Sequence, residues 1–131
     1  MTLLFSLLIS ACASDPNAPP ELRYDLDACA ECSMLVSEPA YSAALVTEDG
    51  QTLPFDDAGC LFRYVLKTSP KVRGMWFFDA AGDRWLRQSE VAFTTGHASP
   101  MGSGLKAVPV GTPGAIGVGE ASGLAFGEKR P

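Results

Sequence analysis

The chain has 131 residues, with 15 acidic and 10 basic side chains, a formal net charge of −5 and one histidine. This acidic balance argues against nucleic acid as a partner and provides no basic patch for anionic lipid. No general base, activated serine or phosphate-binding loop can be assembled from the residues present, so we expect a protein without enzymatic activity.

The chain begins with an apolar run over residues 3–9 that ends in Ser10-Ala11-Cys12. The run is too short for a bilayer span, which needs about 20 apolar residues, but is typical of an export signal. The small residues before Cys12 look like a bacterial lipobox, and an ordinary signal peptide with a free Cys12 is the alternative. We expect a lipid on Cys12 and a location on the periplasmic face of a membrane, with the outer membrane favoured. The predicted divisions are a signal peptide over residues 1–11, a flexible tether over 12–27 and one domain over 28–131.

Sulfur ligands gather at the start of this domain, in Cys29-Ala-Glu-Cys32-Ser-Met34. Thiolate and thioether are soft donors, and Cu(I) is the biological ion that takes both. Methionine is not among the usual ligands of zinc. Because residues two apart share one face of an extended backbone, Cys32 and Met34 could coordinate one ion. We therefore predict Cys32 and Met34 as Cu(I) ligands, and Cys29 as a further ligand, a disulfide partner of Cys32, or neither.

The next stretch predicts one ββαβ unit, over about residues 28–80. An Asp-Gly turn separates two strand-like segments, and Asp56 or Asp57 caps a helix whose apolar positions recur at helical spacing. Cys60 falls in the first turn of this helix among apolar neighbours, so we predict a buried core thiol. The expected elements are strands over 41–47, 52–55 and 74–79 and a helix that ends near residue 67.

The remaining residues predict a second ββαβ unit, over about 81–128, which gives an α+β fold of two successive units in one compact domain. Thr112-Pro113 signals a helix start, although the residues that follow are rich in glycine and disfavour a helix on their own. The expected elements are strands over 83–86, 91–95, 106–110 and 124–126, and a helix over 112–122.

A second sulfur lies on a loop in this half, in Ser99-Pro100-Met101-Gly102. A methionine held between proline and glycine is less easily explained as a core residue than one on a periodic element. We therefore take Met101 as a candidate Cu(I) ligand. His97, four residues earlier, either completes the site or faces solvent.

These motifs, taken in order, resemble the NosL family of lipoprotein copper chaperones that serve nitrous oxide reductase. The resemblance implies a two-part ββαβ fold, Cu(I) binding, and delivery of copper towards the reductase's copper cluster through an ABC-type membrane complex. The family usually has Gly where this chain has Ser33, which restricts the turn more than glycine would. The motifs that carry the resemblance are Cys29-x-x-Cys32-x-Met34, Phe55-Asp56-Asp57-x-x-Cys60, Trp76-x-x-Asp79, Trp85 and Ser99-Pro100-Met101-Gly102-x-Gly104.

Two other functions remain open from the residues alone. Cys29 and Cys32 could form the redox pair of a thiol–disulfide enzyme, although the motif does not start a recognisable helix after a βαβ strand and a proline-rich tether precedes it. Alternatively, Cys29, Cys32, Cys60 and His97 could build a structural zinc site.

Overall fold

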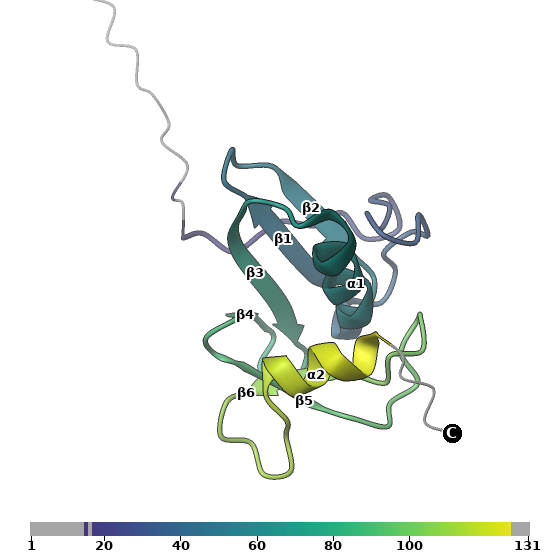
Figure 1. The fold of residues 1–131 in the computed structure, drawn as a ribbon, viewed down its shortest axis with the longest axis vertical. Coiled ribbons are helices and arrows are strands. Elements are labelled where there is room, and N and C mark those ends of the chain that lie inside the picture. Colours follow the sequence, from purple (N-terminus) through teal and green to yellow (C-terminus); the bar gives the residue numbers. More distant parts are fainter. Residues whose placement is uncertain (1–14, 16, 127–131) are drawn as a thin grey trace, which may run out of the picture.

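The computed structural model describes residue 15 and residues 17–126, so the predicted signal peptide and Cys12 lie outside the described residues. Within them, four antiparallel strands form a sheet in the order β2-β1-β3-β4, and β5 and β6 form a second, two-stranded sheet. Helix α1 lies against the larger sheet, and α2 lies near the smaller one (Figure 1). The elements are η1 (Pro39–Tyr41), β1 (Ala43–Thr47), β2 (Thr52–Phe55), α1 (Ala58–Thr68), β3 (Val72–Asp79), β4 (Arg84–Arg87), β5 (Val91–Thr94), β6 (Lys106–Pro109) and α2 (Val118–Ala125).

The first predicted ββαβ unit is confirmed. Strand β1 pairs with β2 on one side and β3 on the other, with Ala43 opposite both Phe55 and Phe77. The Asp-Gly turn between β1 and β2 forms, and Gly50 takes the positive φ of 91° that such a turn needs. Only Asp56 and Asp57 separate the end of this hairpin from the start of α1.

Helix α1 begins where the sequence predicted. Asp57 is its N-cap, and the Asp57 side chain accepts a hydrogen bond from the Gly59 amide. The first turn is buried, including Cys60, which confirms the predicted burial of that thiol. The helix ends at Thr68, and its C-cap, Ser69, adopts a left-handed conformation with φ of 44°.

The second half departs from the expected ββαβ pattern. Strand β4 joins the first sheet, because Leu86 pairs with Phe77 of β3. Helix α2 starts after Gly117 rather than at Thr112-Pro113, and residues 124–126 complete α2 and its C-cap instead of forming a strand. Positive φ angles at Gly111 and Gly114 turn the chain before α2 and prevent an earlier start. The α+β class is confirmed, and this half contributes a ββα arrangement.

Packing against α1 explains why a glycine-rich segment becomes helical. Helix α2 contacts both α1 and β5, and it buries Ala121 and Ala125, which lie one turn apart on the same face. In proteins most helical stability comes from such packing rather than from propensity. Ile116, just before α2, forms an isolated bridge to Phe93 and extends the edge of the small sheet.

Aromatic rings join the two halves. Phe77 of β3 and Phe93 of β5 lie with ring centroids 5.1 Å apart, and Phe62 of α1 lies 5.6 Å from Phe77 and 5.8 Å from Phe93. These edge-to-face and tilted contacts are typical of a packed core. The helix, the large sheet and the small sheet therefore share one core.

The predicted tether is shorter than expected at its C-terminal end. Leu22 and Tyr24, both placed in the tether, pack against the core, and the Tyr24 hydroxyl lies 3.0 Å from Ser42 Oγ. The folded part therefore begins before residue 28.

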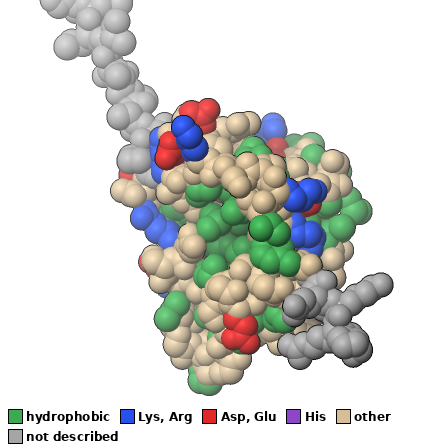
Figure 2. All heavy atoms as spheres, viewed as in Figure 1, with side chains coloured by type: hydrophobic (Ala, Val, Ile, Leu, Met, Phe, Trp, Pro, Cys, Tyr) green, Lys and Arg blue, Asp and Glu red, His purple; other side chains and the backbone are tan. Residues whose placement is uncertain are grey.

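The surface retains some apolar side chains, among them Leu66 of α1 and Leu124 of α2. Figure 2 shows apolar side chains gathered in the middle of the face that carries these helices, with Lys and Arg side chains on both flanks. Among the described residues, no helix has both the length and the apolar character needed to cross a bilayer.

Candidate metal site

Four potential ligands meet where β2 gives way to α1. They are Cys29, Cys32, Asp56 and Cys60, and their ligand atoms all lie within 4.8 Å of one another. Cys29 and Cys32 come from the loop before η1, Asp56 follows the last residue of β2, and Cys60 lies in the first turn of α1. Three sulfurs and one carboxylate oxygen are thus close enough together to hold a metal ion.

Backbone hydrogen bonds shape the loop that carries two of these cysteines. The Cys29 amide donates to the Met34 carbonyl at 2.7 Å, and the Ser33 amide donates to the Cys29 carbonyl at 2.9 Å. A third bond, from Ala30 N to Pro54 O at 2.8 Å, holds the loop against β2. Ser33 adopts a φ of 67°, in the left-handed region where glycine is favoured. The turn therefore needs a conformation that glycine adopts without strain, and here serine adopts it.

The three thiols differ in acidity because they interact with one another. The Cys60 thiol donates a hydrogen bond to Cys29, and this bond, with backbone amides of Cys32, Asp56 and Glu31, lowers the pKa of Cys29 to about 6. The same bond and burial raise the pKa of Cys60 far above its ordinary value. Burial, together with the negative charges of Cys29 and Asp56, raises the pKa of Cys32 to about 11. Without metal, Cys29 is therefore the most acidic of the three thiols.

Hydrogen bonds to neighbouring charged groups orient two of the sulfurs. Cys32 Sγ lies 3.4 Å from Asp56 Oδ1 and donates to it. Arg63 Nη2 lies 3.2 Å from Cys60 Sγ, and Arg63 Nη1 donates to the Ala125 carbonyl at 3.4 Å. Arg63 thus places a positive charge beside sulfurs that become anionic when they bind metal, which favours the charged state.

The two predicted thioether ligands are accessible to solvent. Met34 is 59% exposed and Met101 is 36% exposed. The Met101 amide donates to Asp57 Oδ2 at 3.0 Å, so this loop lies against the N-terminus of α1, next to Asp56. His97 is not one of the four convergent groups, and its Nε2 lies 2.8 Å from Thr94 Oγ1.

Cys60 and Asp56 belong to this group, although the sequence predicts only a core thiol and a helix cap at these positions. The structure shows Asp57 as the cap, which leaves Asp56 free to face Cys32. The sequence contains one signal for this: two aspartates stand together at the helix start, and because only one can be the N-cap, the other is left for another role.

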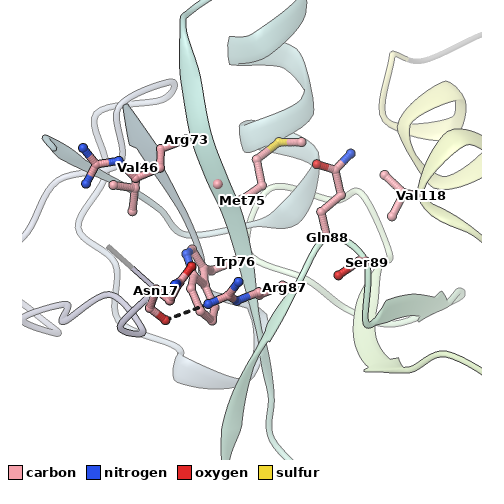
Figure 3. A pocket seen from close by; sticks show the side chains of 10 residues that line it. Asn17, Val46, Arg73, Met75, Trp76, Arg87, Gln88, Ser89 and Val118 are labelled. Carbon is pink, nitrogen blue, oxygen red and sulfur yellow. Dashed lines mark hydrogen bonds between the residues drawn. The ribbon is translucent and has the colours of Figure 1, made fainter. Parts of the chain in front are cut away.

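A cavity of about 700 Å³ lies away from these four residues (Figure 3). Its lining includes Arg87, which donates to the Asn17 carbonyl at 2.9 Å and stacks over the Trp76 ring at 4.9 Å. The only sulfur in the lining belongs to Met75. The cavity therefore lacks the donor set of a metal site, and the Arg87 contact holds residue 17 against the sheet.

No family model and no curated protein sequence matches the chain. Among solved structures, the crystal structure of the copper chaperone NosL from Shewanella denitrificans matches with a TM-score of 0.50 and 18% identity. The match covers 82% of this chain and 87% of that one. The chain has a NosL-like fold. The NosL resemblance seen in the ordered sequence motifs is thereby supported at the level of the fold.

Proposed function

We propose that this chain is a Cu(I)-binding metallochaperone with no catalytic turnover. The observation that carries the proposal is the convergence of Cys29, Cys32 and Cys60 within 4.8 Å in a NosL-like fold. Thiolates are soft ligands that suit Cu(I). Two exposed thioethers, Met34 and Met101, lie on the loops that flank these thiols and add donors of the same kind.

The arrangement suits transfer of the ion as well as binding. Cys29 and Cys60 are buried, whereas Cys32 is partly exposed and Met34 is largely exposed. An ion held between them has one protected side and one side open to the ligands of a partner. Neutral thioethers hold Cu(I) less firmly than additional thiolates would, which favours release to an acceptor.

The cellular role follows from the NosL resemblance. We propose that a lipid on Cys12 anchors the protein on the periplasmic face of a membrane, with the outer membrane favoured. The copper would then pass through an ABC-type complex to the copper cluster of nitrous oxide reductase. Support comes from the lipobox-like Ser10-Ala11-Cys12 and from the ordered motifs of the domain. Mass spectrometry of the membrane fraction would reveal a diacylglyceryl group on Cys12 if this role is right.

A structural zinc site is the second candidate, and Asp56 favours it. Three cysteines and one carboxylate form a four-ligand set that zinc accepts in tetrahedral geometry. His97, which sequence analysis offered as the fourth zinc ligand, is not part of this group.

A thiol–disulfide enzyme fits the geometry less well. Such enzymes need a thiol that is both acidic and accessible. Here the acidic thiol, Cys29, is 2% exposed. Cys32 is more exposed, but its pKa is raised.

Anaerobic competition between metals decides between copper and zinc. The reduced domain is titrated with Cu(I) against a Cu(I) chelator, and separately with Zn(II) against a zinc chelator. We expect Cu(I) to be bound far more tightly and to displace zinc completely. Retention of zinc in the presence of excess Cu(I) would instead establish the structural zinc site.

Variants then test which sulfurs bind the ion. Cys32→Ser and Cys60→Ser should each reduce Cu(I) affinity by at least about tenfold, because each removes a soft donor. Met34→Leu should have a smaller effect. Met75→Leu is the matched control, since Met75 lies on β3 and packs against the core. Equal losses in Met75→Leu and Cys32→Ser would show that the assay reports folding rather than ligation.

A further inference from the structure

One buried carboxylate ties the Met101 loop to helix α1. Asp57 is fully buried, and its Oδ1 accepts hydrogen bonds from the Gly59 amide, at 2.8 Å, and from the Ser103 hydroxyl. Its Oδ2 accepts from the Met101 amide at 3.0 Å. Helix capping needs only the first of these bonds, so the other two serve the loop.

Hydrogen bonds within the Met101 loop hold its backbone in place. Ser99 Oγ accepts from the Gly104 amide at 2.9 Å, the Ser99 carbonyl accepts from the Gly102 amide at 3.1 Å, and the Gly104 carbonyl accepts from the His97 amide at 3.1 Å. These bonds fix the loop backbone, while the Met101 side chain stays partly exposed.

Helix α1 also leaves room for the loop. A Cβ atom on Gly59 would lie 2.6 Å from Ser103 Cβ, which is closer than real atoms approach. Glycine at this position therefore allows the loop to sit directly on the first turn of the helix, in which Cys60 is the next residue.

We propose that Asp57 is a positioning residue that holds Met101 beside the thiol cluster as an additional Cu(I) ligand. The proposal rests on the Cu(I)-binding function. Asp57 is bonded to Asp56, whose carboxylate belongs to the cluster, and it precedes Cys60 by three residues on the same helix start. The Asp57 side chain thus fixes the position of the Met101 loop relative to the first turn of α1.

Asp57→Asn separates docking of the loop from capping of the helix. Asparagine caps helices about as well as aspartate, but it has one acceptor oxygen. With that oxygen on the Gly59 amide, the amide NH₂ group faces the Met101 N–H and cannot accept its bond. We expect Cu(I) affinity to fall about tenfold, as in Met101→Leu.

The double variant Asp57→Asn/Met101→Leu should bind Cu(I) no more weakly than Met101→Leu alone, because Asp57 acts through Met101. If Asp57→Asn lowers Cu(I) affinity as much in the Met101→Leu background as in the wild type, the proposal is overturned. Asp79→Asn is the matched control, since Asp79 is a buried aspartate at the end of β3, and it should leave Cu(I) affinity unchanged.

A measurement without copper separates this proposal from the proposed function. In the reduced metal-free protein, amide exchange at Met101 should accelerate at least about tenfold in Asp57→Asn, while amides in the middle of α1 keep their protection. Unchanged protection at Met101 would refute the positioning role. If Asp57→Asn releases the loop but the wild type binds no Cu(I), the docking contact stands while the ligand role of Met101 and the proposed function both fail.

Discussion

Gly59→Ala tests the close contact between α1 and the Met101 loop, and it should reverse the usual effect of this substitution. In an open helical position, replacing glycine by alanine stabilises a protein by roughly 0.5–1 kcal/mol. At Gly59 the added Cβ would lie 2.6 Å from Ser103 Cβ and 3.2 Å from Asp57 Oδ1. Overpacking of this kind costs about 1–3 kcal/mol. The net result should be destabilisation by up to about 2.5 kcal/mol.

The assay is urea unfolding of the reduced, metal-free protein, with Gly123→Ala as the matched control. Gly123 lies within α2, and a Cβ at this position would meet nothing within 4 Å. Gly123→Ala should therefore stabilise the protein by roughly 0.5–1 kcal/mol. If Gly59→Ala stabilises the protein as much as Gly123→Ala does, the loop does not rest on the helix and the reasoning is refuted.

Three further predictions concern the thiols. Because folding lowers the pKa of Cys29 from 9.0 to about 6, the stability of the metal-free protein should rise from pH 6 to 9. Because folding raises the pKa of Cys32 to about 11 and that of Cys60 further still, stability should fall again above pH 9. Urea midpoints measure both limbs, and Cys29→Ser should remove the first limb and weaken the second, since Cys29 contributes to both raised pKa values. At neutral pH, Cu(I) binding by all three cysteines should release about two protons, from Cys32 and Cys60. Calorimetry in buffers of different ionisation enthalpy measures this number, and a value near zero would contradict three-thiol ligation. Arg63→Gln should weaken Cu(I) binding about tenfold, because it removes the positive charge beside Cys60 Sγ. Unchanged affinity would show that this charge has no part in binding.

Local signals predicted the first half of the fold. The Asp-Gly turn before β2, the aspartate cap of α1 and the helical spacing of its apolar residues all depend on neighbours in the chain. Each element formed within a few residues of its predicted bounds. The second helix was misplaced because its sequence carries little helical preference, and its bounds were set by contact with α1.

Local signals also predicted only part of the candidate site. Cys29 and Cys32 could be recognised from the sequence because they are close together in the chain. Cys60 and Asp56 join them only because β2 ends where α1 begins and the cysteine loop folds back onto that junction. The burial of Cys60 could be predicted, but its partners could not.

The sequence by itself therefore determined the donor chemistry of this protein, which is soft sulfur, and the α+β class of its fold. The tertiary structure decided which donors meet. Asp57 and the Met101 amide are 44 residues apart, yet a single hydrogen bond joins them. Such contacts depend on how the helix, sheet and loop pack together, and that packing minimises the free energy of the whole domain rather than of any one segment.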